Sequence, residues 1–380
     1  MTNIELLKAM VEIDTTNDKA NESQLALFLA NYIKPYADML DFITAPSGGR
    51  KNVLACFGNL KSKNILCFNG HFDVVSADSK DWDTEPFRLK VKNGLAYGRG
   101  TADMKGGIVA SIQAIIRAKK DGLLKDKLVV FIGSVDEETG ADSKLGAGYV
   151  VTKLSGLGIQ PTGCIIPEPA TYKKDLRINL GHRGLMWLKC TAIGKAMHSG
   201  LINTEDNAIN NMMSFVAEVQ KIITNQPKKV DEVPESSCRV VYIESGDEKA
   251  FNKVPDKAVV HMDVRTSPMD NNDKILEIIN GIALKHKIEV KIEKNTPSAS
   301  IKRQEKIVTV FEGVFKRLGE NYSIGYASPT CDAHWFISAG IPTINGLGVS
   351  GDGVHAQNEF IEIESLNKRE ELFYQVIKDW

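Results

Sequence analysis

The chain has 380 residues, of which 43% are hydrophobic and 25% are charged, and this globular balance excludes collagen, coiled coils and long disordered tails. Its 47 Lys and Arg nearly match its 48 Asp and Glu, so the basic excess of a dedicated nucleic-acid binder is missing and we expect no nucleic-acid partner. The longest apolar runs, such as residues 128–132, are far too short to span a bilayer, so we expect no membrane association.

The six cysteines are widely scattered and form no Cys-x-x-Cys pair. This pattern is typical of buried, reduced thiols rather than of a disulfide framework. The N-terminal segment is amphipathic and acidic and lacks the apolar core of a signal peptide. We therefore predict a cytoplasmic protein with more than one domain.

Short apolar strands alternate with helical patterns over the first half of the chain. Residues 52–58 and 64–70 are typical of strands separated by a charged turn, and residues 107–119 repeat isoleucines along one face of a helix. The apolar run 127–135 is typical of a strand buried on both faces of a sheet, and 164–169 is a further strand that ends at prolines. This alternation predicts an α/β domain.

The pattern changes near residue 177. Residues that follow alternate as in an antiparallel sheet with one exposed face, and they are succeeded by two amphipathic helices and further strands. The expected elements are helices at 209–223 and 272–286 and strands at 238–245, 257–267 and 287–294. A helix at 304–318, a strand at 341–346 and a C-terminal helix then resume the α/β pattern. We predict one discontinuous domain, residues 1–176 and 296–380, with an α+β domain of residues 177–295 inserted into it.

Five clusters of His, Asp and Glu fall at the predicted ends of elements, next to Gly or Pro. They are HFD at 71–73, GRGTADMKGG at 98–107, VDEETG at 135–140, PEP at 167–169 and GVHAQNE at 353–359. Singly, each has an ordinary structural explanation, such as a hydrogen-bonded histidine or a solvated acidic face. Open α/β sheets, however, collect their active sites at strand ends. Together the clusters predict a site built from imidazole and carboxylate groups.

These motifs, in this order and spacing, resemble those of the M20 family of metallohydrolases, and the resemblance covers almost the whole chain. It extends to HSG at 198–200 in the inserted domain. The resemblance implies a zinc-exopeptidase-like sheet sandwiched by helices, with an inserted ferredoxin-like domain that serves as a lid and a dimerisation surface. It also implies a metal-dependent hydrolase that cleaves a linear amide.

The resemblance implies a site for two divalent metal ions. His71 and Glu168 would bind one ion, Glu138 and His355 the other, and Asp103 would bridge both. Nitrogen and oxygen ligands without sulfur suit zinc, cobalt or manganese, and zinc is the expected occupant. Two such ions can lower the pKa of a shared water and polarise the scissile carbonyl, so that a bridging hydroxide attacks it.

Two further carboxylates would serve the same site. Glu137 matches the family's general base, which takes the proton of the water and passes it to the leaving amine. Asp73 matches the carboxylate that orients the ring of His71, although an Asp at this position can also simply cap a turn. The glycines around Asp103 permit tight turns, and in the family the peptide bond after this Asp is often cis.

Three residues of the inserted domain are candidates for contact with the substrate. His198 matches the family's His that reaches across a dimer to stabilise the tetrahedral oxyanion, which implies a homodimer through this domain. Asn252, in NKVP, matches a segment of the family that faces the substrate. Arg265 can grip a substrate carboxylate, or it can form a salt bridge with Asp263 instead.

Two segments depart from the family pattern. HFDVVSAD lacks the proline that often follows the HxD motif, and in SPTCDAH the residues Cys331 and His334 replace commoner ones, which leaves specificity open. A cysteine hydrolase that uses Cys331 with His334 and Asp332 is one alternative reading. A non-catalytic binding protein on the same scaffold is another.

The predicted function is the removal of an acyl group from an N-acyl amino acid, as in the acetylornithine deacetylases and succinyl-diaminopimelate desuccinylases of the family. The alternative within the family is an aminopeptidase, dipeptidase or carboxypeptidase that acts on short peptides. The residues leave the acyl group and the accepted side chain open.

Overall fold

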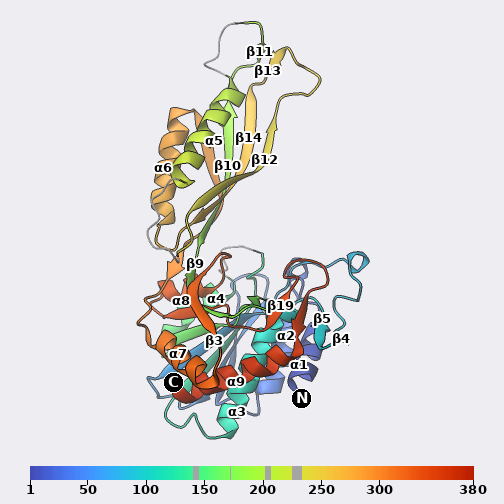
Figure 1. Cartoon of the computed structure of the whole chain (residues 1–380), viewed down its shortest axis with the longest axis vertical. Helices are drawn as coiled ribbons and strands as arrows, with labels where there is room; N and C mark the ends of the chain where they lie inside the picture. The colour runs from blue at the N-terminus through green and yellow to red at the C-terminus, as the bar shows by residue number, and fades with distance from the viewer. Residues whose placement is uncertain (140–144, 172, 202–206, 225–232) are drawn as a thin grey trace. The chain divides into compact units, whose positions relative to one another are not determined.

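The computed structural model describes residues 1–139, 145–171, 173–201, 207–224 and 233–380 (Figure 1). The chain forms two compact units. The first unit consists of Met1–Gly181, Ile301–Ala327 and Cys331–Trp380, and the second consists of His182–Ser300 with Ser328–Thr330.

The main sheet of the first unit is mixed. Its strands lie in the order β1-β2-β6-β3-β7-β18-β9, and β17 also pairs with β9. Their bounds are Met39–Thr44 (β1), Lys51–Gly58 (β2), Ile65–His71 (β3), Leu128–Ser134 (β6), Gly163–Ile166 (β7), Leu176–His182 (β9), Tyr322–Ala327 (β17) and Thr343–Asn345 (β18). The central pairs β6–β3, β3–β7 and β7–β18 are parallel, so these strands end at the same edge of the sheet.

The helices of the first unit carry apolar stripes that cover the sheet. They are Asn3–Val11 (α1), Glu22–Ile33 (α2), Gly106–Lys120 (α3), Ala147–Leu154 (α4), Lys306–Leu318 (α7), Ala333–Ser338 (α8) and Ile363–Asp379 (α9). A capping box starts α1, because Thr2 and Glu5 each accept a hydrogen bond from the other's backbone. Within the parts of the chain that the structure describes, every helix is too short or too polar to cross a membrane.

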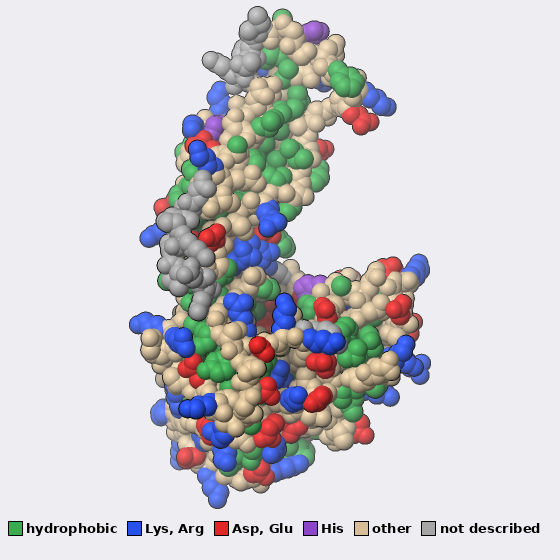
Figure 2. Space-filling view, viewed as in Figure 1, with side chains coloured by type: hydrophobic (Ala, Val, Ile, Leu, Met, Phe, Trp, Pro, Cys, Tyr) green, Lys and Arg blue, Asp and Glu red, His purple; other side chains and the backbone are tan. Residues whose placement is uncertain are grey.

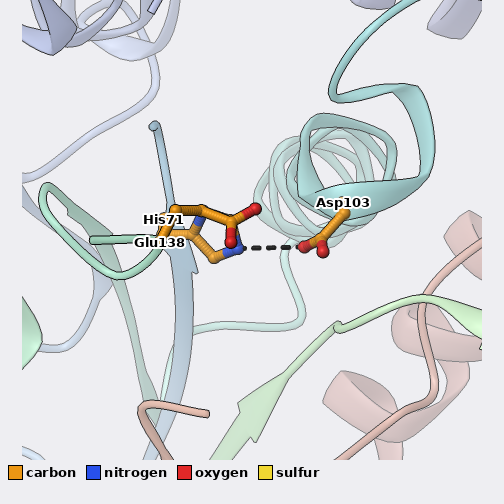
Figure 3. Close-up of side chains that lie close together, drawn as sticks. All are labelled: His71, Asp103 and Glu138. Carbon is orange, nitrogen blue, oxygen red and sulfur yellow. Dashed lines mark hydrogen bonds and ion pairs between the residues drawn. The ribbon is translucent and has the colours of Figure 1, made fainter. Parts of the chain in front are cut away.

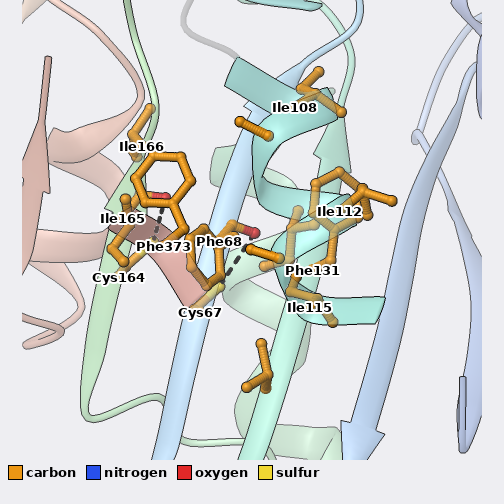
Figure 4. Close-up of a cluster of buried hydrophobic side chains, with 14 of the residues drawn as sticks. Cys67, Phe68, Ile108, Ile112, Ile115, Phe131, Cys164, Ile165, Ile166 and Phe373 are labelled. Carbon is orange, nitrogen blue, oxygen red and sulfur yellow. Dashed lines mark hydrogen bonds between the residues drawn. The ribbon is translucent and has the colours of Figure 1, made fainter. Parts of the chain in front are cut away.

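The core of the first unit joins the predicted strands to α3 and α9 (Figure 4). Ile108, Ile112 and Ile115 repeat along one side of α3 and are fully buried, as their spacing predicts. Phe68 of β3 meets Phe373 of α9 edge to face, with ring centroids 5.5 Å apart. Burial of both faces explains why β3 and β6 are apolar throughout, apart from their final residues.

A second sheet in the first unit gathers segments that are distant in the sequence. Its strands lie in the order β4-β5-β20-β19-β8, with bounds Lys90–Lys92 (β4), Leu95–Tyr97 (β5), Ala170–Thr171 (β8), Ser350–Asp352 (β19) and Phe360–Glu362 (β20). The sheet places three motifs at its margin: residues 98–103 follow β5, 353–359 join β19 to β20, and Glu168 precedes β8. This sheet is therefore what brings the late histidine segment to the GRG segment.

The second unit is an antiparallel sheet with two helices on one face (Figure 1). The sheet order is β12-β14-β10-β15, and α5 and α6 pack on it to form a separate apolar core. The bounds are Gly184–Ile193 (β10), Met197–His198 (β11), Ala208–Thr224 (α5), Ser237–Ser245 (β12), Lys253–Val254 (β13), Lys257–Thr266 (β14), Asn272–Lys285 (α6), Ile288–Thr296 (β15) and Ala299–Ser300 (β16). Figure 2 shows apolar side chains over the strands of this unit. Val241 and Ile243 of β12 are exposed.

One predicted element differs in the structure. The segment that starts near residue 177 was expected to have one exposed face, but in β9 every residue except Arg177 is buried. The reason is that β9 pairs antiparallel with β18 at Asn345 and so belongs to the main sheet of the first unit. The first unit accordingly continues to Gly181, beyond the expected junction at 177, and the second continues to Ser300, beyond 295. In both units the arrangement of sheets and helices agrees with the predicted α/β fold carrying an α+β insertion.

Candidate functional site

His71 is the last residue of β3, at the edge of the main sheet where the parallel strands end. Its ring is almost fully buried, with Nδ1 3.0 Å from the backbone oxygen of Asp73 and Nε2 3.1 Å from Oδ1 of Asp103. Burial by itself would lower the pKa of His71, but the hydrogen bond to Asp103 and the charge of Glu168 raise it well above its ordinary value. The contact of Nδ1 with the main chain thus orients the ring, and Nε2 points toward the Asp103 carboxylate.

Asp103 lies in the short turn before α3, and each of its oxygens faces a different histidine. Oδ1 lies 3.1 Å from Nε2 of His71, and Oδ2 lies 3.3 Å from Nε2 of His355. Burial would raise the pKa of Asp103, but the hydrogen bonds with His355 and His71 keep it well below its usual range. The peptide bond between Asp103 and Met104 is cis.

Glu138 completes a tight group with His71 and Asp103 (Figure 3). One ligand atom from each of the three residues lies within 4.8 Å of the others. Nε2 of the half-exposed His355 is 2.9 Å from Oε2 of Glu138, and the hydrogen bonds to Asp103 and Glu138 raise the pKa of His355 to about 10. The structure therefore brings four of the five predicted ligands into direct contact.

The fifth predicted ligand, Glu168, interacts with this group through its charge. Burial and then the charge of Asp103 raise the pKa of Glu168 well above its ordinary value. The same causes raise the pKa of Glu138. Buried carboxylates that raise each other's pKa are relieved by nearby positive charge, so a set of imidazole nitrogens and carboxylate oxygens of this kind fits divalent cations.

Glu137 and Glu138 are aimed by the turn that follows β6. Asp73, which is fully buried, accepts a hydrogen bond from the backbone N–H of Glu137 at 3.1 Å and from that of Glu138 at 2.7 Å. Asp136 adopts a left-handed conformation with φ of 69°, which reverses the chain between the strand and these two residues. Burial raises the pKa of Glu137 well above its ordinary value, and the positive charge of His71 opposes this.

The Asp136 turn is tied to the rest of the unit through Arg50. The Arg50 guanidinium donates to Oδ1 of Asp136 at 2.8 Å and to both oxygens of the fully buried Glu22 in α2. An Arg–carboxylate pair of this fork geometry is strong and directional. This network gives a structural reason for the Asp at the start of the DEE motif.

The three candidates of the second unit lie in two places. Met197–His198 (β11) pairs with Lys253–Val254 (β13), and the backbone N–H of Ser199 donates to the oxygen of Asn252 at 2.8 Å, so His198 and Asn252 are neighbours. His198 is exposed, and its Nδ1 accepts from the backbone N–H of Gly200 at 3.1 Å. Arg265 instead holds the Asp263 carboxylate through Nε at 2.8 Å and Nη2 at 3.1 Å, which is the salt bridge weighed as its alternative role.

The structure disfavours a thiol nucleophile at Cys331. The Cys331 side chain is buried, and burial raises the pKa of its thiol well above the ordinary value. Nδ1 of His334 lies 2.9 Å from the backbone oxygen of Cys331, which holds the ring by the main chain. Asp332 hydrogen bonds with Asn69 and Ser134, and burial raises its pKa to about 6.

For two residues inside the sequence motifs, the sequence alone predicts no function. They are Arg99 of GRG and Glu359 of the late histidine segment, and both are buried and paired with each other at 2.8 Å. A signal that could have revealed them is that the segment carrying Asp103 contains an Arg and the segment carrying His355 contains a Glu, which are side chains of opposite charge. Their partners depend on the second sheet and are invisible to local periodicity.

Comparison with known proteins agrees with these features. Residues 67–379 match the family described as Peptidase family M20/M25/M40. A probable succinyl-diaminopimelate desuccinylase of Staphylococcus aureus (strain N315) is 30% identical over 97% of this chain and 95% of its own length. A succinyl-diaminopimelate desuccinylase of Legionella pneumophila (strain Lens) is 28% identical over 87% of each chain.

Solved structures share the fold. An M20 family metallo-carboxypeptidase of Sulfolobus solfataricus superposes with a TM-score of 0.80 at 18% identity, over 100% of this chain and 99% of that one. The aminopeptidase PepT of Bacillus cereus superposes with a TM-score of 0.77 at 20% identity, over 99% of this chain and 97% of that one. The chain therefore belongs to peptidase family M20/M25/M40, as its motifs predict, and is a metal-dependent hydrolase.

Proposed function

We propose that this chain is a two-metal deacylase that removes the acyl group of an N-acyl amino acid, with N-succinyl-diaminopimelate as the first substrate to test. The observation that carries the proposal is the position of Asp103, whose two oxygens face His71 and His355 separately. A carboxylate placed in this way suits a bridge between two cations. Support for the acyl group comes from the relatives that are named succinyl-diaminopimelate desuccinylases.

The proposed ligand sets are those that the resemblance to the family implies, and the contacts among His71, Asp103, Glu138 and His355 support them. His71 and Glu168 would hold one ion, Glu138 and His355 the other, and Asp103 both. The donor set favours zinc, with cobalt or manganese as functional substitutes. Bound there, the ions would acidify a water molecule and polarise the scissile carbonyl.

The remaining steps are assigned to side chains of the protein. Glu137 would take the proton of the attacking water and deliver it to the amine that leaves, a role that suits a buried carboxyl group whose pKa is raised. Asp73 would fix both the ring of His71 and the backbone of Glu137, since it contacts each of them. Asn252 would contact the substrate. Arg265 would do so only if its guanidinium turned away from Asp263.

We also propose a cytoplasmic homodimer. The exposed Val241 and Ile243 lie on β12, an edge strand of the second unit, and an apolar edge of this kind favours pairing with a second copy. His198 of the partner subunit would then stabilise the oxyanion of the tetrahedral intermediate. The buried, unpaired thiols of all six cysteines suit a reducing compartment.

A substrate panel tests the function. The metal-stripped protein is reloaded with zinc, cobalt or manganese and assayed with N-succinyl-diaminopimelate, N-acetyl-ornithine, other N-acyl amino acids and dipeptides. We expect metal-dependent release of the amine from an N-acyl amino acid. Faster cleavage of dipeptides would establish the exopeptidase alternative instead, and metal binding without any hydrolysis would indicate a binding protein.

A further inference from the structure

Glu359 is a fully buried carboxylate in the loop that joins β19 to β20. Its Oε1 accepts hydrogen bonds from the backbone N–H groups of Ala102 at 2.8 Å and Asp103 at 3.0 Å. Its Oε2 accepts from the backbone N–H of Gly100 at 2.9 Å and from Nη1 of Arg99 at 2.8 Å. Each oxygen thus has two donors, and three of the four donors are backbone groups of the segment that carries Asp103.

Arg99 ties the same two segments together from the other side. Its guanidinium is buried, and besides Glu359 it donates through Nη2 to the backbone oxygen of Ala356 at 2.9 Å and of Ser76 at 3.4 Å. Ala356 directly follows His355. The Arg99–Glu359 pair therefore joins residues 98–103 to residues 353–359 through side chains whose charges offset each other.

The position of His355 needs such a support. His355 is half-exposed and adopts a left-handed conformation with φ of 61°, which an L-residue rarely takes without constraint from its surroundings. Its Nε2 nevertheless lies 3.3 Å from Oδ2 of Asp103 and 2.9 Å from Oε2 of Glu138. The buried pair is the side-chain contact that reinforces this junction, beside the backbone hydrogen bond from the N–H of Gly98 to the oxygen of Glu359 at 3.0 Å.

We infer that Glu359 and Arg99 are positioning residues that set the distance between Asp103 and His355 and so make the second metal position. This inference rests on the proposed two-metal function. It assigns the pair a role beyond folding, because the hydrogen bonds of Glu359 end on the backbone of Asp103 itself. Groups that orient metal ligands from behind commonly change metal affinity or activity by about 10–100-fold when they are mutated.

The test is a titration of the metal-free, full-length protein with Co²⁺ by isothermal calorimetry, together with steady-state kinetics. The Glu359→Gln variant keeps the shape of the side chain but turns an NH₂ group toward N–H donors. We expect wild type to bind two Co²⁺ ions per chain and Glu359→Gln to bind one of them about 10–100-fold more weakly, with a lower kcat and an almost unchanged KM. The Arg99→Lys variant keeps the positive charge but loses the planar guanidinium with its several donors. It should also bind one Co²⁺ ion more weakly than wild type, by a smaller factor than Glu359→Gln.

Lys127→Gln is the matched control. Lys127 is also a buried cation with main-chain partners, donating from Nζ to the backbone oxygens of Ile377 at 3.1 Å and Lys378 at 3.0 Å. It directly precedes β6, at the end of that strand opposite to the site. This variant should lose thermal stability yet bind both ions as wild type does.

The outcomes separate the two proposals. Wild type that binds fewer than two ions would refute the two-metal function itself. Wild type that binds two, with Glu359→Gln also binding two at wild-type affinity, would refute the positioning role alone. If Glu359→Gln does not fold, the decision passes to Arg99→Lys, where unchanged affinity for both ions refutes the inference.

Discussion

Arg50, directly before β2, donates a hydrogen bond at 2.8 Å to Asp136, which follows β6, and both side chains are buried. Asp136 is the left-handed residue that directs Glu137 and Glu138 away from β6. The ion pair therefore supports the active-site turn from outside the site. Glu22 closes the network on the other side of the guanidinium.

Replacing Arg50 by Met should be costly. The change leaves the carboxylates of Glu22 and Asp136 buried without their partner, and breaking a buried ion pair in this way costs about 3–5 kcal/mol. The control is Arg117→Met, whose exposed pair with Glu371 is worth about 0–1 kcal/mol. Urea unfolding of the metal-free proteins measures both, and equal losses for the two variants would contradict the assignment.

Replacing Asp73 by Asn should impair activity more than folding. One carboxylate oxygen accepts from Glu137 N–H and the other from Glu138 N–H, so an amide NH₂ must face one of these donors. We expect kcat/KM to fall about 10–100-fold, with weaker metal binding. Asp121→Asn, at an exposed carboxylate that accepts from Tyr374, serves as the control and should keep wild-type kinetics.

Glu137→Gln should nearly abolish turnover while leaving metal binding intact. Loss of a general base commonly costs about 10²–10⁴-fold in rate. Residual turnover of about 1% of wild type or less is therefore expected, measured at saturating substrate with metal content determined on the same sample. A variant that keeps more activity than this would remove Glu137 from the proposed role.

Removal of metal separates metal catalysis from thiol catalysis. A chelator should abolish hydrolysis because it removes the proposed metal ions. Added Zn²⁺, Co²⁺ or Mn²⁺ should restore hydrolysis, because the proposed ligands are nitrogen and oxygen atoms without sulfur. Cys331→Ala should retain activity, since the buried thiol has a raised pKa and little thiolate character. Activity that survives the chelator but not Cys331→Ala would revive the cysteine hydrolase.

Two helical glycines should respond in opposite directions to alanine. A Cβ on Gly107 of α3 would lie 2.1 Å from the backbone oxygen of Pro167, directly before Glu168, whereas one on the exposed Gly313 of α7 would meet nothing within 4 Å. Gly107→Ala should destabilise the protein by about 1–3 kcal/mol. Gly313→Ala should stabilise it by about 0.4–1 kcal/mol. Thermal unfolding of the two variants side by side checks the pair.

Much of the first unit can be predicted from local patterns. The apolar runs of β3 and β6 and the isoleucine stripe of α3 reflect burial that depends on strand and helix geometry alone. The candidate ligands His71 and Glu138 stand out because polar groups interrupt or follow such runs. The family motifs extend this reading to Asp103, Glu168 and His355.

Other features depend on partners that are far away in the sequence. β9 reads as a half-exposed strand, and its pairing within the main sheet, with β18 among its partners, explains why it is buried. Arg265 reads as a substrate contact, with an ion pair as its alternative, and the tertiary structure places its guanidinium on Asp263. The periodicity of the sequence does not tell which charged side chains form ion pairs with each other.

The chemistry of the candidate site is therefore legible in residue types and their spacing, because imidazole and carboxylate groups at strand ends have few other purposes when several occur together. The residues that hold the site in place cannot be recognised from the sequence. Arg50, Arg99 and Glu359 look like ordinary charged residues until the fold removes water from them. Their roles are decided by tertiary structure, since a buried charge is stable only beside its particular partners.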